Sequence, residues 1–191
     1  MRKLMIVCGL CASFISESYG NNTAYSAEYW TEKVEKYFNQ LDSFEADFWQ
    51  TMNNKNVAGK IWLKRPILRF TLGNITIVAQ KHKITQYNSR LKEKTENQKN
   101  PYSALLKRPM KLTDVVNVGE VSKVGGVLHF TVHPRDIAVD ITFMFDVTTS
   151  GLVLKGWNIK YNSQKEIKVK LGAMKPIKCD DRDLLNYSKD I

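Results

Sequence analysis

The sequence predicts a mainly β, α+β fold built on an antiparallel sheet that curls. Short segments of alternating apolar and polar residues recur at roughly ten-residue spacing, and tight-turn residues separate them. An amphipathic helical pattern precedes the first of these segments. Because successive short strands joined by tight turns pair with their chain neighbours, such a series forms an antiparallel sheet.

The first predicted element is a helix over residues 26–41. Its apolar side chains follow the spacing of one helical face, and they are Trp30, Val34, Tyr37, Phe38 and Leu41. Ser26 is suited to cap the N-terminus, and Glu28 falls in the first turn, where a negative charge interacts favourably with the helix dipole. The apolar stripe predicts that this helix packs on the core.

Most of the remaining elements are predicted strands. Alternating or β-branched segments indicate strands at 44–52, 57–70, 75–79, 84–87, 115–121, 127–132, 137–147, 152–154, 157–161 and 167–171. The polar run 89–100 is predicted as a solvated loop or a frayed helix. A short helix is predicted at 101–106, with proline in its first turn. From Val115 onward only strands are expected.

The stretch 59–70 has an unusual pattern. Extended alternation places Ile61, Leu63 and Arg65 on one face, so a guanidinium lies in line with two apolar side chains. Pro66 follows, and proline cannot donate to a sheet ladder. On this chemistry alone, the favoured interpretation is a strand that ends at Pro66 with Arg65 in solvent.

The first 20 residues have the composition of a secretory signal peptide. Arg2 and Lys3 precede an uncharged run at 4–16, and small residues follow up to Gly20. A basic segment, an apolar segment and a small-residue cleavage site are the parts of such a signal. We therefore expect cleavage after Gly20 and a single domain over 21–191. No later stretch approaches the roughly 18 apolar residues of a membrane-spanning helix.

The net charge of the chain indicates which kinds of partner it could bind, and its cysteine content indicates whether an internal disulfide can form. The chain carries a formal charge of +10, and loss of Arg2, Lys3 and Glu17 would leave +9. This balance favours acidic partners, such as anionic lipid headgroups or an acidic protein surface, and export argues against nucleic acid. Cleavage would leave Cys179 as the one remaining cysteine, so no internal disulfide is expected.

The sequence indicates a protein that is not an enzyme. Nucleophile-elbow and phosphate-loop motifs are absent from it. His129 and His133 share a strand face near Asp136, but without an obvious third ligand an ordinary surface is the favoured interpretation. The acidic cluster at 180–183 lacks the glycine-containing loop of a calcium site. We therefore expect no metal and no cofactor.

Large aromatic residues are concentrated in the predicted strands; they are Phe48, Trp49, Trp62, Phe70 and Trp157. A curved sheet has a concave side that is either filled by a core or used as a pocket. The residue pattern leaves both possibilities open. One is a core closed by the two helices, and the other is an apolar pocket that takes acyl chains.

The run Gly-Lys-Ile-Trp-Leu-Lys-Arg-Pro at 59–66, followed by Leu-Arg-Phe at 68–70, resembles a known signature. It is similar to that of the bacterial outer-membrane lipoprotein carrier family, the LolA-type periplasmic chaperones. The patterns at 41–50, 101–106 and 143–171 resemble that family as well. The resemblance implies a half-open, curved antiparallel β-barrel covered by a lid of short α-helices, in a periplasmic protein.

The same resemblance implies a chaperone that binds the acyl chains of triacylated lipoproteins released from the inner membrane and carries them to the outer membrane. The implied partners are an inner-membrane lipoprotein-releasing ABC transporter and an outer-membrane lipid-anchored receptor, and a monomer is expected. The implied cavity residues are Phe48, Trp62, Leu68, Phe70, Ile77 and Trp157. Arg65 is the implied gate residue, which holds the lid closed.

Two other classes stay open. One is a periplasmic sensor module of the same fold that binds a partner protein or lipid. The other is a secreted protein that binds anionic lipid or a polyanion through its positive charge, and this binding would weaken strongly with salt.

Overall fold

The computed structural model describes residues 25–98, 100, 102–135, 138–161, 165–178 and 180–186. Within them, all neighbouring strands pair antiparallel in one sheet of 11 strands, in the order β6-β5-β4-β3-β2-β1-β11-β10-β9-β8-β7. The strands are β1 (Ser43–Met52), β2 (Lys55–Lys64), β3 (Ile67–Leu72), β4 (Ile75–Gln80), β5 (Lys83–Asn88), β6 (Glu93–Asn97), β7 (Val116–Val124), β8 (Val127–Pro134), β9 (Val139–Thr148), β10 (Gly151–Tyr161) and β11 (Glu166–Leu171). The sheet is open, because β6 and β7 lie at opposite ends of this order.

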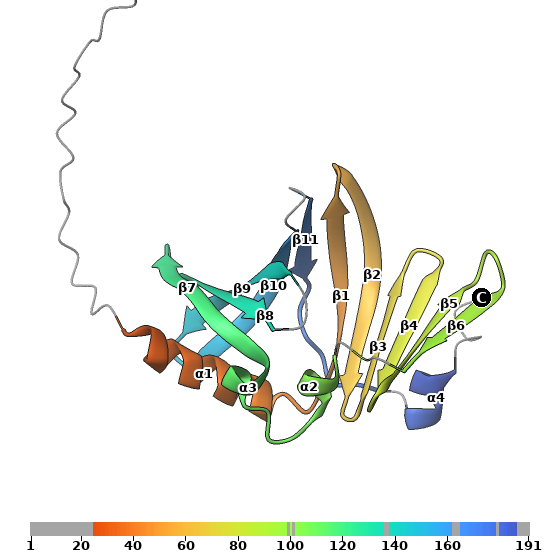
Figure 1. Cartoon of the computed structure of the whole chain (residues 1–191), viewed down its shortest axis with the longest axis horizontal. Coiled ribbons are helices and arrows are strands. Elements are labelled where there is room, and N and C mark those ends of the chain that lie inside the picture. The colour runs from red at the N-terminus through yellow and green to blue at the C-terminus, as the bar shows by residue number, and fades with distance from the viewer. Residues whose placement is uncertain are drawn as a thin grey trace, which may run out of the picture.

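Four helices accompany the sheet in the described residues: α1 (Ala27–Gln40), α2 (Ser103–Leu106), α3 (Leu112–Val115) and α4 (Asp181–Leu185). Figure 1 shows the sheet curving around α1, α2 and α3, whereas α4 lies beside β3 to β6. Residues of the first three helices and of the segment between α2 and α3 share one buried cluster with the strands. We call the side that they cover the concave face.

Two glycines allow the sheet to curve and pack closely. A Cβ atom on Gly59 would lie 2.3 Å from the carbonyl oxygen of Thr71 and 2.4 Å from the ring of Phe48. Phe48 is the cross-strand partner of Gly59, so its ring covers the backbone of β2. Gly156 follows a register shift between β9 and β10, and a Cβ there would lie 2.0 Å from the carbonyl oxygen of Val169.

Several sequence predictions are confirmed. The predicted helix is α1, with Ser26 Oγ accepting a hydrogen bond of 3.2 Å from Tyr29 N, and Trp30, Val34 and Phe38 are buried. The mainly β fold, the curved antiparallel sheet and the covering short helices are also present. The predicted strands at 75–79 and 84–87 are β4 and β5, and the predicted short helix includes α2.

Three predictions about individual elements are wrong. The run 57–70 is two strands, β2 and β3, because the chain turns at Arg65 and Pro66. The polar run 89–100 contains strand β6, which pairs with β5 although its side chains are exposed. Backbone hydrogen bonds hold this edge strand without an apolar pattern. The chain after Val115 also contains a helix, α4, which Asp180 caps through a 2.8 Å bond from Asp183 N.

Other predictions lie outside the described residues. These are the signal peptide at 1–20 and the placements of Pro101, Asp136 and Cys179. Among the helices that the structure describes, none has both the length and the apolar content that a membrane span requires.

Candidate functional site

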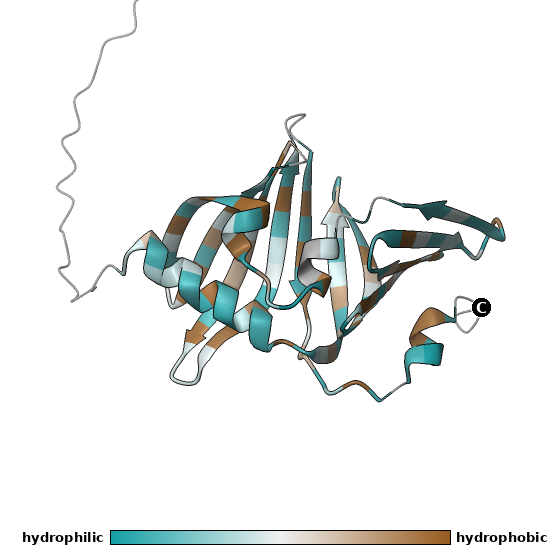
Figure 2. Cartoon of the chain, turned by 60° about the horizontal axis from the view of Figure 1, so that its bottom comes forward, coloured by the Kyte–Doolittle hydropathy of each residue, from teal (hydrophilic) through white to brown (hydrophobic). Residues whose placement is uncertain are grey.

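The concave face of the sheet carries a continuous apolar cluster. Trp30, Val34 and Phe38 of α1 pack against strand residues such as Phe130 and Phe145, which are fully buried. The ring of Phe38 meets the rings of Phe143 and Phe145 edge-on, with centroids 5.5 and 6.1 Å apart. Figure 2 shows α1 lying across the strands, and the charged residues Glu32, Lys33 and Lys36 of this helix are exposed. The apolar surfaces of the helix and the sheet therefore cover each other.

Most of the residues that were expected to line an acyl cavity lie in this cluster. Phe48 and Leu68 are buried in it, and Phe70 and Trp157 pack against it while partly exposed. Ile77 is the cross-strand partner of Phe70, and directly opposed residues share a face of the sheet. The ring of Phe70 also meets that of Tyr102, just before α2, at 5.8 Å. These side chains thus gather on the concave face, and Phe70 lies next to the start of α2.

The expectation that Trp62 lines the cavity is wrong, because Trp62 lies on the other face of the sheet. Side chains alternate along β2, and Leu63 occupies the concave face. Trp62 instead packs against a second cluster formed by Ile67, Val78 and Leu184 of α4. The alternation of Ile61 and Leu63 in the sequence already indicated this opposite orientation.

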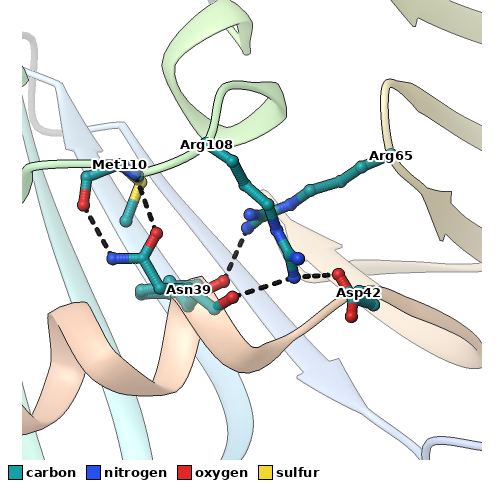
Figure 3. Close-up of polar contacts among 6 residues, drawn as sticks. Asn39, Asp42, Arg65, Arg108 and Met110 are labelled. Carbon is teal, nitrogen blue, oxygen red and sulfur yellow. Dashed lines mark hydrogen bonds and ion pairs between the residues drawn. The ribbon is translucent and has the colours of Figure 1, made fainter.

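Arg65 reaches from the β2–β3 turn to the C-terminal end of α1. Its Nη2 atom donates a 2.6 Å hydrogen bond to the carbonyl oxygen of Phe38 (Figure 3), and its backbone N–H donates to Asp42 O at 3.3 Å. Its Nε and Nη1 atoms are buried and have no hydrogen-bond partner within the described residues. Burial lowers the pKa of the Arg65 guanidinium. Arg65 therefore joins the sheet to the helix with only part of its donors in use.

A second arginine binds the same end of α1. Arg108, from the segment between α2 and α3, donates a 2.9 Å hydrogen bond to the carbonyl oxygen of Asn39 and forms an ion pair with Asp42 (Figure 3). The last carbonyl groups of a helix lack intrahelical partners and carry partial negative charge. Since α1 has no basic residue in its own last turn, arginines from elsewhere in the chain supply the positive charge.

Asn39 connects α1 to the same segment through a reciprocal pair of hydrogen bonds. Its Nδ2 atom donates to Met110 O, and Met110 N donates to its Oδ1 atom, both at 2.8 Å (Figure 3). One turn earlier, Glu35 accepts a 2.8 Å bond from Leu112 N at the start of α3. We call this set of polar contacts, formed by Glu35, Asn39, Arg65, Arg108 and their partners, the latch.

Only Arg65 of the latch was singled out from the sequence. Asn39 and Glu35 lie on the predicted helix outside its apolar stripe, where most residues are simply solvated. Their partners are backbone groups about 70 residues away, and no sequence pattern pairs them. One available signal was the absence of a basic residue at the C-terminal end of α1, which leaves its carbonyl groups in need of donors.

The outer face of the sheet holds a separate contact with α4. Arg69, 3% exposed, donates from Nη1 to Leu184 O at 3.1 Å and to Asn186 O at 2.7 Å. Its guanidinium also lies 5.6 Å from the centroid of the Trp62 ring. An ion pair of 2.7 Å between Lys64 and Asp181 adds to this attachment. Arg69 thus attaches the end of α4 to β3.

His133 and the acidic residues at the start of α4 form ordinary pairs in the described part of the chain. His133 Nδ1 lies 2.7 Å from Asp140 Oδ1, at an exposed position. Asp180 and Asp181 are used by the cap of α4 and by Lys64. Among described residues, no three histidine, cysteine or acidic side chains are grouped so that they could hold a metal ion.

Three solved structures of low sequence identity are similar to this chain. A LolA superfamily protein from Nitrosomonas europaea is 10% identical, with 87% of this chain and 99% of that one covered and a TM-score of 0.46. A DUF1329 family protein from Desulfovibrio piger is 5% identical, with 86% and 99% covered and a TM-score of 0.50. For the MucA/MucB complex of Pseudomonas aeruginosa the identity is 13%, the coverage 85% and 61%, and the TM-score 0.45.

A comparison with curated proteins gives no match. A family model gives a match over most of the chain, from the last turn of α1 to α4. This model describes the outer membrane lipoprotein carrier protein LolA, and it matches residues 39–183. The chain therefore belongs to the LolA family.

Proposed function

We propose that this protein is a periplasmic chaperone that takes acyl chains of lipoproteins between its helices and the concave face of its sheet. The observation that carries this proposal is the concave cluster itself. Its two apolar surfaces belong to different elements, and polar contacts of the latch join those elements at one end. Opening the latch would present both surfaces to an apolar ligand.

The cost of separating α1 from the sheet is large enough that the helices should open only when a ligand binds. Full burial of a large apolar side chain contributes about 1.5–3 kcal/mol, so separating Trp30, Val34 and Phe38 from the sheet into water would cost roughly 5–9 kcal/mol. Each buried methylene of an acyl chain contributes about 0.8 kcal/mol. The empty open form is therefore disfavoured, and roughly 6–11 methylenes would offset its cost.

Arg65 fits the role of a gate that opens and closes repeatedly. Its bond to Phe38 O is a hydrogen bond from a charged donor, which contributes about 1.5–3 kcal/mol. Its two unpaired buried nitrogen atoms each cost about 1–3 kcal/mol in the closed form. On these values the Arg65 contact contributes little net free energy to closure, so the apolar cluster and the other latch contacts hold the helices, and Arg65 does not make closure irreversible.

The family membership supports the rest of the proposal. The cargo would be triacylated lipoproteins, received from an inner-membrane lipoprotein-releasing ABC transporter and passed to a lipid-anchored receptor on the outer membrane. No bond is made or broken in this transfer. The segment at 1–20 would direct export, and 21–191 would form one carrier domain that works as a monomer. The cavity lining would comprise Phe48, Leu68, Phe70, Ile77 and Trp157.

A reversible lock on the latch tests the proposal. Asn39→Cys and Met110→Cys would be combined with Cys179→Ser in protein expressed without residues 1–20. The side chain of Asn39 bonds both backbone groups of Met110, so the two positions are neighbours, and mass spectrometry would verify that the disulfide has formed. Binding of a fluorescent fatty-acyl probe would be measured by titration at moderate salt, before and after reduction.

We expect saturable probe binding by the reduced protein and strong loss of binding when the disulfide forms. The matched control is the Cys179→Ser protein under the same two conditions, which should bind the probe equally in both. Equal binding by the locked and reduced forms would contradict an opening at the latch. Absence of binding by folded, reduced protein would contradict acyl binding and would favour a protein-binding module of the same fold.

A further inference from the structure

Large apolar side chains are exposed along one rim of the sheet, which we call the turn rim. It comprises the β1–β2 and β5–β6 turns and the end of β10, on the side away from α1 and α3 (Figure 1). Leu91 in the β5–β6 turn is 59% exposed, and Tyr161 at the end of β10 is 41% exposed. Met52 and Val57, beside the β1–β2 turn, are 41% and 38% exposed.

Positive charge accompanies these apolar side chains. Lys55, Arg90, Lys92 and Lys165 are exposed on the same rim, and none forms an ion pair with another described residue. The carboxylate of Glu166 nearby is bound to Lys168 at 3.2 Å. The turn rim therefore offers cations that are free to bind anions, next to exposed apolar groups.

The turn that presents Leu91 has a defined shape. The backbone N–H groups of Arg90 and Leu91 both donate to Asn88 Oδ1, at 3.1 and 3.2 Å. Ser89 N donates to Asn74 O at 2.9 Å, which ties this turn to the β3–β4 turn. Because the backbone of this turn is ordered before any contact, a partner would pay little backbone entropy when it binds the leucine and its flanking cations.

We propose that the turn rim docks on the surface of an anionic lipid bilayer, with Leu91 entering the headgroup layer. Apolar side chains that insert shallowly beside lysine and arginine are the features that peripheral proteins use at such surfaces. The excess positive charge of the chain agrees with this partner. The proposal concerns the empty protein and does not depend on acyl chains in the concave face.

Vesicle binding of the full exported chain tests the docking surface. Sedimentation with vesicles of phosphatidylcholine alone would be compared with vesicles of equal parts phosphatidylcholine and phosphatidylglycerol. The test variant is Arg90→Gln with Leu91→Ser. The control is Lys123→Gln with Val124→Ser, because Val124 is 68% exposed in the β7–β8 hairpin and the pair has the same chemistry. Circular dichroism would show that both variants are folded.

We expect the unchanged protein to prefer anionic vesicles and to release them as salt rises. Loss of one cation should weaken binding about fivefold and loss of the inserted leucine about tenfold, so the test variant should bind about 50-fold more weakly. The control should change by less than about twofold. Equal losses in both variants, equal binding to both vesicles, or no vesicle binding would each overturn the proposal. An acidic protein surface would then be the better partner for these cations.

Discussion

Replacement of Asn39 by alanine should lower the free energy of unfolding and raise the affinity of the protein for acyl chains. The change removes both hydrogen bonds to Met110 and leaves the backbone groups of this buried residue without partners. Two neutral hydrogen bonds contribute about 1–3 kcal/mol, and unpaired buried groups add to the cost. Alanine is the better helix former by about 0.5 kcal/mol, so the net loss should be about 2–3 kcal/mol.

The two effects arise from one cause, because the lost contacts exist only in the closed form. A loss of about 2 kcal/mol from that form makes opening about 30-fold more favourable, and the apparent affinity for an acyl probe should rise by up to that factor. Urea unfolding would measure the stability, and a titration with the fluorescent fatty-acyl probe would measure the affinity.

Leu184→Ala provides the matched control for this prediction. Leu184 is a residue of α4 that is buried against the outer face of the sheet, and its truncation should cost about 2–5 kcal/mol of unfolding free energy. Because α4 has no part in the latch, probe affinity should stay unchanged. If Asn39→Ala behaved like this control, with lower stability and unchanged affinity, the helices would not open at the latch.

Three other substitutions have distinct outcomes. The Arg65→Leu variant should still bind lipoprotein but fail to transfer it to a receptor, whereas the Lys64→Leu control should transfer normally. A reconstituted transfer assay would measure both variants. Efficient transfer by Arg65→Leu would show that Arg65 has no part in the mechanism. The Arg69→Met substitution should lower the free energy of unfolding by about 3 kcal/mol and leave the affinity for the probe unchanged. It should also expose the C-terminal segment to limited proteolysis. A C-terminal segment that stays protected would contradict the role of Arg69 in attaching α4 to β3. Burial, and to a smaller extent the charge of Tyr161, raises the pKa of Tyr102 above its usual 10.0. The unfolded chain therefore loses this proton at a lower pH than the folded protein does. The free energy of unfolding should fall as the pH rises from 10 through the pKa of the folded state. Tyr102→Phe should show a shallower decline in urea unfolding at alkaline pH, and an identical decline would show that Tyr102 does not cause it.

The parts of the fold that the sequence predicted are those set by local pattern. The stripe from Trp30 to Phe38 has helical spacing, and Ser26 precedes it, so α1 could be placed nearly to the residue. The strand β6 could not be predicted in this way, because Glu93–Asn97 is polar on both faces and is held by backbone hydrogen bonds to β5. Its structure depends on a neighbour, not on its own composition.

The candidate site shows the same division. Alternation and a family resemblance indicated Phe48, Leu68 and Phe70, and all three lie on the concave face. The buried position of Arg69 has no local signal, because its partners are carbonyl groups of α4, which itself was not predicted. The pairing of Asn39 with Met110 likewise joins two segments through one side chain and backbone atoms. Such contacts are properties of the assembled chain.

The position of β1 in the sheet has a consequence for how the molecule folds. Strands β1 to β6 form one run of neighbouring hairpins and β7 to β11 another, and in the strand order only the β1–β11 pairing joins the two runs. Phe48 pairs with Leu171, and most of the described residues lie between them in the sequence. During synthesis each run can form from contacts close in sequence, but closing the long loop between β1 and β11 is the slow, entropically costly step. Until β11 arrives, β1 offers an unpaired edge, and the molecule is most open to aggregation at that moment.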